Sequence, residues 1–242
     1  MELQPLKKII EESDNIVFFG GAGVSTESGI PDFRSADGLY ETESGGKYAP
    51  EQILSYEFFI QHPKEFYQFY IDKMIYTDVK PNLAHQMLAE LEKRGKLKAI
   101  ITQNIDGLHQ QAGSQKVLEL HGSIHRNYCM TCKQFYPLEY ILKHKNEVPI
   151  CEKCGGIVKP DVVLYQESLD QDVLSQSVKY ISEADVLIVG GTSLQVYPAA
   201  GLIEYYNGNK MILINKSPTP YDSRANYLIP ESIGKVMQAL LA

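Results

Sequence analysis

The sequence predicts an α/β protein with a doubly wound parallel sheet and a smaller domain beside it. Short apolar runs rich in Val, Ile, Leu and Phe recur along the chain. They lack clean polar alternation, which is typical of parallel strands covered on both faces. Segments with helical periodicity lie between them, and this alternation favours a parallel sheet with helices on both sides. The predicted strands are 16–19, 98–102, 117–120, 186–189 and 211–214.

Helices are predicted between and around these strands. Residues 1–12 have the pattern of an amphipathic helix, without the long apolar core of a signal peptide. The clearest helix is 84–94, which begins after Asn82 as N-cap and stops at Gly95. Two later helices are predicted at 178–184 and 233–241. The apolar face of helix 84–94 is expected to hold Leu83, Met87, Leu88 and Leu91.

Composition excludes several classes of protein. The chain has 242 residues, 44% of them hydrophobic and 22% charged, which is ordinary for a globular protein. Its formal net charge of −7 disfavours a general nucleic-acid binder, which needs a basic surface. No apolar run approaches the ~20 residues of a membrane span. We therefore expect a cytoplasmic monomer with no specific nucleic acid and no membrane as partner.

Two segments interrupt the alternation of strands and helices. Residues 37–78 are rich in Tyr and Phe and predict short helices without a strand, while residues 126–159 hold all four cysteines. We interpret both as insertions that together form the smaller domain. This interpretation assigns residues 1–36, 79–125 and 160–242 to the larger domain.

The cysteines form two C-x-x-C pairs, Cys129 with Cys132 and Cys151 with Cys154, separated by residues 133–150. Two such pairs at this spacing predict one tetrahedral Zn²⁺ in a zinc-ribbon module. Four sulfur ligands leave no position for water, so the ion is expected to be structural. Disulfides and buried unliganded thiols are the alternatives, and an apparently cytosolic protein disfavours disulfides.

A glycine-rich turn follows the first predicted strand. Glycines at 20, 21 and 23 allow backbone amides to approach a pyrophosphate closely. Thr26 stands where the usual G-x-G-x-x-G motif has its third glycine, which disfavours a classical dehydrogenase. The following Pro31-Asp32-Phe33-Arg34 places an acid, an aromatic ring and a base behind the turn, which a plain capping loop does not explain. The segment predicts an unusual dinucleotide site in a Rossmann-like domain.

Polar residues follow the other predicted strands. Gln103-Asn104-Ile105-Asp106 comes directly after strand 98–102, and His121 follows strand 117–120. In open α/β sheets ligands bind outside the carboxyl ends of the strands, so these residues are expected to meet at one nucleotide site. A histidine in that position is suited to act as a general base. The last two strands end in Thr192, Ser193 and Asn215.

These motifs together resemble the sirtuins, a family of NAD-dependent protein deacylases. With almost no extension at either end, the chain is similar to the compact bacterial members. The resemblance covers nearly the whole sequence and includes the two C-x-x-C pairs. The other matching motifs are GAGVS (21–25), GIPDFR (29–34), TQNID (102–106), HG (121–122), GTSL (191–194) and IN (214–215).

The resemblance implies a reaction and a role for each residue. NAD is a co-substrate, the partners are proteins or peptides containing acetyl-lysine, and the products are free lysine, nicotinamide and 2′-O-acyl-ADP-ribose. His121 is the general base. Asn104 is the second catalytic residue and contacts the ribose on the nicotinamide side. Phe33 keeps nicotinamide from returning, and Asp106 with Ile105 binds its carboxamide. The remaining NAD contacts are implied for Ala22, Thr26, Arg34, Gln103, Thr192, Ser193, Asn215 and Ile233.

Two departures from the family pattern concern the substrate. Tyr165-Gln166-Glu167 stands where the family often has Phe-Gly-Glu, and the loss of that glycine is expected to alter one wall of the peptide cleft and with it the sequence preference. The peptide is still expected to add as a strand between residues 163–165 and 194–196. Members that prefer succinyl-lysine carry Tyr-x-x-Arg, whereas this chain has Tyr70 in place of the arginine. An unpaired buried carboxylate is costly, so neutral acyl groups are expected, acetyl first.

Two other functions fit some of the same motifs. A mono-ADP-ribosyltransferase would use the same nicotinamide pocket but attach ADP-ribose to a side chain. A non-catalytic NAD or ADP-ribose sensor could use the zinc module to bind a partner, but it would need neither a base at His121 nor Asp106. Product masses and nicotinamide release distinguish the three.

Overall fold

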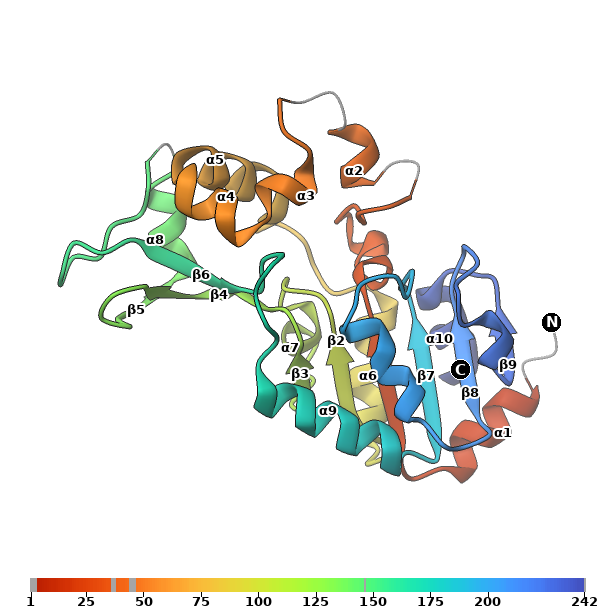
Figure 1. The fold of residues 1–242 in the computed structure, drawn as a ribbon. Coiled ribbons are helices and arrows are strands. Elements are labelled where there is room, and N and C mark those ends of the chain that lie inside the picture. Colours follow the sequence, from red (N-terminus) through yellow and green to blue (C-terminus); the bar gives the residue numbers. More distant parts are fainter. Residues whose placement is uncertain (1–3, 36–37, 44–46, 146, 242) are drawn as a thin grey trace.

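A computed structural model describes residues 4–35, 38–43, 47–145 and 147–241 (Figure 1). Its largest feature is a sheet of six parallel strands in the order β3-β2-β1-β7-β8-β9. The strand order reverses between β1 and β7, which is where open α/β sheets bind ligands. The strands are β1 (Ile16–Gly20), β2 (Leu97–Thr102), β3 (Val117–Glu119), β7 (Val186–Gly190), β8 (Met211–Ile214) and β9 (Tyr227–Ile229).

Helices bury both faces of this sheet, as the apolar runs predict. Side chains along a strand alternate between faces, so Phe18 packs on one side while Val17 and Phe19 pack on the other. Helices α1 (Gln4–Glu12), α6 (Leu83–Lys93) and α10 (Ile233–Leu241) cover the Phe18 face. The opposite face is covered by α9 (Gln171–Glu183) and the 3₁₀ helix η3 (Ala199–Tyr205).

The five predicted strands are confirmed, and β9 is an addition that its sequence does not signal. β9 has three residues, and its central Leu228 is 46% exposed, so it lacks a buried apolar run. The start of α6 is also confirmed, because the Asn82 side chain accepts a hydrogen bond from Ala84 N at 2.9 Å. Gly95 follows the helix with a φ of +74°, a conformation that favours glycine.

One detail of the predicted apolar face of α6 is wrong. Leu83 is 39% exposed, because it lies at the first helical position and points away from the buried stripe of Ala84, Leu88 and Leu91. His85 takes a place in that stripe instead and is fully buried, with its ring 4.7 Å from the ring of His109. These two histidines therefore belong to the buried packing on the Phe18 face of the large sheet.

Two further predicted helices are found with different limits. α9 begins at Gln171 rather than 178, because the Asp170 side chain accepts hydrogen bonds from the amides of Asp172 and Val173 and caps it there. α1 buries Leu6 and Ile10, as expected of an amphipathic helix, although residues 1–3 of that prediction lie outside the described residues. None of the described helices is both long and apolar enough to cross a membrane.

A second, three-stranded antiparallel sheet lies beside the first, in the order β5-β4-β6. Short helices pack on it and, within the described part of 37–78, no strand occurs (Figure 1). Aromatic side chains from α4 and α5 fill its core, among them Phe59, Phe66 and Tyr67. The elements are β4 (Gly122–Cys129), β5 (Phe135–Pro137), β6 (Val158–Val162), α2 (Leu39–Thr42), α3 (Pro50–Ile53), α4 (Tyr56–Gln61), α5 (Pro63–Met74) and α8 (Leu138–Lys143).

Candidate active site

The turns after β1 and β7 are in direct contact at the crossover point of the large sheet. Gly23 N donates a hydrogen bond to Gly191 O at 2.8 Å. A Cβ on Gly23 would lie 2.9 Å from Gly191 Cα, and one on Gly191 would lie 2.4 Å from Val24 N. Gly191 also has a φ of +59°. Glycine at both positions is what allows the two turns to meet.

Two adjoining cavities open along this edge of the sheet, with volumes of about 250 and 690 Å³. Every non-metal residue assigned from the sequence lines one or both. Of these residues, Ile105 and Asp106 line only the smaller cavity. Five line only the larger cavity: Thr26, Thr192, Ser193, Asn215 and Ile233. The other six line both cavities: Ala22, Phe33, Arg34, Gln103, Asn104 and His121.

A buried polar cluster fixes Asp106 at the smaller cavity. Ser25 Oγ donates a hydrogen bond to Asp106 Oδ2 at 2.6 Å, and Asn104 Nδ2 donates to Ser25 Oγ at 3.1 Å. The other carboxylate oxygen, Oδ1, accepts from Leu108 N at 2.9 Å. These contacts hold the carboxylate in one orientation. Ser25 is 1% exposed, and its role is not predicted from the glycine-rich motif because only the fold brings it to Asp106.

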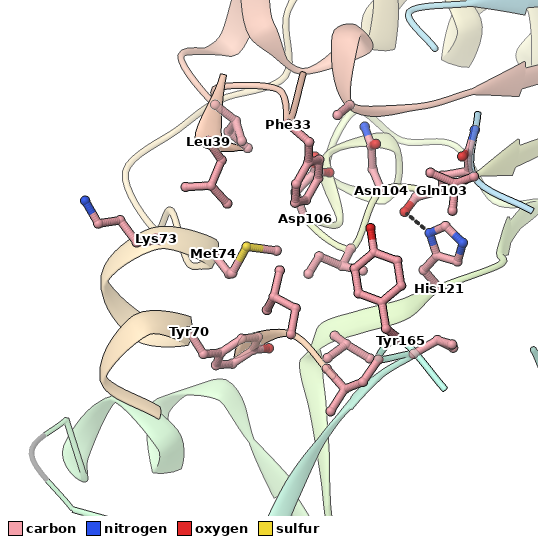
Figure 2. A pocket seen from close by; sticks show the side chains of 18 of the residues that line it. Phe33, Leu39, Tyr70, Lys73, Met74, Gln103, Asn104, Asp106, His121 and Tyr165 are labelled. Carbon is pink, nitrogen blue, oxygen red and sulfur yellow. Dashed lines mark hydrogen bonds between the residues drawn. The ribbon is translucent and has the colours of Figure 1, made fainter. Parts of the chain in front are cut away.

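His121 lies where the two cavities meet, between the end of β3 and the start of β4. Its Nδ1 is 3.0 Å from the carbonyl oxygen of Gln103 (Figure 2). A carbonyl can only accept, so Nδ1 carries the hydrogen and Nε2 keeps its lone pair. Burial lowers the pKa of His121, and the hydrogen bond with Gln103 opposes that shift. The imidazole is therefore neutral near pH 7 and able to accept a proton at Nε2.

The far wall of the smaller cavity comes from the second region of the molecule. Figure 2 shows Tyr70 and Met74 of α5 and Leu39 of α2 on this side, facing Tyr165 and Phe33. Lys73 also lines the cavity, but its ammonium group is 2.6 Å from the Glu43 carboxylate. This wall is mostly apolar, and the cation that Lys73 brings to it is already paired.

The four cysteines form a cluster suited to a metal ion. Their sulfur atoms all lie within 4.8 Å of one another, and two of the separations are 3.4 Å (Cys129–Cys154) and 3.6 Å (Cys132–Cys151). A tetrahedral zinc with Zn–S bonds of about 2.3 Å places its sulfur ligands roughly 3.8 Å apart. The donor set and spacing fit a structural Zn²⁺ that joins β4 to the loop before β6, as the sequence predicts.

Comparisons with family models, curated proteins and solved structures all indicate the same family. A model described as the Sir2 family matches residues 21–198. The NAD-dependent protein deacetylase of Clostridium acetobutylicum is 62% identical over 240 residues, which is 99% of this chain and 98% of the relative. A solved Sir2 structure with a deacetylated p53 peptide and 3′-O-acetyl ADP-ribose is 38% identical, with a TM-score of 0.92 over 100% of this chain and 98% of that one. A Sir2–p53 peptide–NAD⁺ structure is likewise 38% identical, with a TM-score of 0.88 and the same coverage.

Proposed function

The chain belongs to the Sir2 family, and from this premise we propose how its site carries out NAD-dependent deacetylation of protein lysine. The protein is an NAD-dependent protein deacetylase that acts on acetyl-lysine substrates. The two adjoining cavities suit the two substrates: the larger would hold the adenosine and phosphates of NAD, and the smaller would hold nicotinamide and the acyl-lysine.

The observation that carries the proposal is the neutral imidazole of His121 at the junction of the two cavities. Once nicotinamide has left and the acyl oxygen has bonded to the ribose C1′, a ribose hydroxyl must lose its proton. His121 Nε2 would accept that proton, while the Gln103 carbonyl stabilises the imidazolium through Nδ1. The 2′-oxygen then attacks the acyl carbon, and water releases lysine and 2′-O-acyl-ADP-ribose.

The other residues would bind and orient the substrates. Asp106, with the Ile105 backbone, would bind the carboxamide of nicotinamide, and the donors to its two carboxylate oxygens support this role because they fix its orientation. Phe33 would cover the pocket that nicotinamide leaves. Asn104 bonds to Ser25 and would position the ribose. The phosphates, riboses and adenine would contact Ala22, Thr26, Arg34, Gln103, Thr192, Ser193, Asn215 and Ile233.

The zinc and the limits of the two domains complete the proposal. The four thiolates would hold a Zn²⁺ that stabilises the second region and does no chemistry, because no coordination position is open. We propose the larger domain as residues 1–36, 79–125 and 160–242 and the smaller as 37–78 and 126–159. Their limit at 36/37 falls outside the described residues.

We also propose a location and an assembly state. Zinc bound by four thiolates is compatible with a reducing compartment, which supports the cytoplasm as the location. We propose a monomer that binds no specific nucleic acid.

The test is product analysis by mass spectrometry. The protein is incubated with an acetyl-lysine peptide, with and without NAD. Loss of the acetyl mass that requires NAD, together with equal release of nicotinamide and acetyl-ADP-ribose, is the expected result. Gain of an ADP-ribose mass on a protein or peptide would identify a mono-ADP-ribosyltransferase instead. Binding of NAD without any release of nicotinamide would identify a sensor.

A further inference from the structure

Tyr165 and Gln166 replace the Phe-Gly of the family pattern, and each makes a side-chain contact that Phe or Gly could not supply. Tyr165 Oη is 2.7 Å from Tyr40 Oη. Gln166 Oε1 accepts from Glu57 N at 3.0 Å, at the start of α4. Glu167, which follows the family pattern, pairs with Lys159 of β6 at 2.9 Å. The segment that would receive the peptide is thus attached to three different parts of the molecule.

The Tyr40 end of the hydroxyl pair belongs to the segment that would cover NAD. Tyr40 N donates to Phe33 O at 3.0 Å, and the two rings meet edge to face at 5.4 Å. The Arg34 guanidinium lies 5.2 Å from the centre of the Tyr40 ring. These contacts tie the position of Tyr40 to those of Phe33 and Arg34, the two residues proposed to cover nicotinamide and to contact the phosphates.

The Tyr165 end belongs to the segment that would bind the peptide. Its backbone is fixed by two hydrogen bonds to residues 54–56, from Tyr165 N to Leu54 O and from Tyr56 N to Tyr165 O, each 3.0 Å long. Its side chain reaches into the smaller cavity on the same side as His121 (Figure 2). An acyl-lysine bound in the smaller cavity would therefore lie beside this ring, because Tyr165 and His121 line the same cavity.

We propose that the hydroxyl groups of Tyr40 and Tyr165 form a clasp that couples the binding of NAD to the binding of the acylated peptide. The inference rests on the proposed function and deepens it. NAD that holds Tyr40 in place, or a peptide that holds Tyr165 in place, favours the bonded pair and so prepares the other site. Linkage requires the effect to be equal in both directions. One neutral hydrogen bond limits it to about fivefold in affinity.

The test measures coupling at equilibrium, without turnover. Calorimetry gives the Kd of carba-NAD, an unreactive analogue with a methylene in place of the ribose ring oxygen, with and without saturating acetyl-lysine peptide. The wild type is expected to bind carba-NAD more tightly with peptide. Tyr165→Phe restores the residue that the family often has, so it should fold. We expect Tyr165→Phe and Tyr40→Phe each to reduce the coupling about three- to fivefold, and the double variant to reduce it no further.

A matched control is Tyr206→Phe. Its hydroxyl donates to Asp185 O at 2.8 Å and accepts from Lys210 N at 3.0 Å, and neither Tyr206 nor these partners line the two cavities. It should leave the coupling unchanged. The proposal is overturned if the wild type shows no coupling, if the two single losses add in the double variant, or if Tyr165→Phe weakens peptide binding equally without carba-NAD. Failure of the proposed function is a separate outcome, seen as no NAD-dependent loss of the acetyl mass from the peptide with the wild type.

Discussion

The two sheets of this molecule contribute to the site in different ways. The six-stranded sheet presents its residues at the carboxyl ends of parallel strands, where the backbone fixes them directly. The three-stranded region has a small core and a four-cysteine cluster, and it contributes walls through loops and short helices. His121 stands at the connection between β3 of one sheet and β4 of the other. We therefore expect the chemistry to depend mainly on the six-stranded sheet and the choice of acyl group to depend mainly on the smaller region.

Removal of zinc is expected to have the largest effect and to distinguish the two regions by their stability. We expect a chelator, or Cys132→Ser, to abolish deacetylation because β6 and the following peptide segment lose their support. The large sheet should remain folded and still bind ADP-ribose. Hydrogen exchange would show this as lost protection in β4–β6 and kept protection in β1, β2 and β7. Simultaneous loss of both would show that the sheets form one cooperative unit.

Substitution of His121, at the connection between the two sheets, is expected to have the next largest effect on activity. His121→Ala should lower kcat about 10²–10⁴-fold, the usual contribution of a general base, with the fold intact. Because burial lowers the pKa of His121 below 6.5, the neutral base persists into mild acid. The kcat/KM of the wild type should therefore be flat near pH 7 and fall only below about pH 6.5. A variant that retains wild-type kcat would remove His121 from the mechanism.

Acid should weaken the large region through His85. Burial lowers the pKa of His85 to about 4, although Asp106 and Glu27 oppose the shift. The unfolded histidine titrates near 6.5, so it binds more protons than the folded one between these values. Stability is therefore complete above pH 6.5 and falls by about 2–3 kcal/mol as the pH drops to 4.5.

Urea unfolding at pH 7 and pH 4.5 measures this loss. His85→Gln keeps a polar side chain without a titrating ring, and its acid loss should be smaller than that of the wild type by the same amount. An equal acid loss in both proteins would assign the effect to other groups.

Acyl choice is the smallest of these effects and tests the apolar wall. Acetyl-lysine should react at least about tenfold faster than succinyl-lysine, since an unpaired carboxylate would be buried beside Tyr70. Glu43→Gln frees the Lys73 ammonium, which now pairs with Glu43 at 2.6 Å. Glu43→Gln should therefore lower the ratio of kcat/KM for acetyl-lysine to kcat/KM for succinyl-lysine. The control Glu90→Gln on α6 should leave this ratio unchanged. Faster turnover of succinyl-lysine by the wild type would contradict the assignment.

The same contrast explains how much of the site could be predicted from the sequence. Residues such as Asp106 and His121 follow buried apolar runs, and the rule for the ends of parallel strands then predicts that they share one edge of the sheet. The spacing of the cysteines likewise predicts the metal site. The Tyr40–Tyr165 contact could not be foreseen, because it joins residues 125 positions apart whose positions depend on packing. The burial of His85 could not be foreseen either, because its polar side chain gives no apolar signal.

The contact between Gly23 and Gly191 sets a limit on how this protein can vary. A single added methyl group at either residue collides with backbone, which cannot rotate aside as a side chain can. In a saturation library selected for deacetylase activity, we expect no substitution at Gly23 or Gly191 to survive, not even alanine. Two residues that have no side chain to contribute are thus strongly restricted by the approach of the two turns.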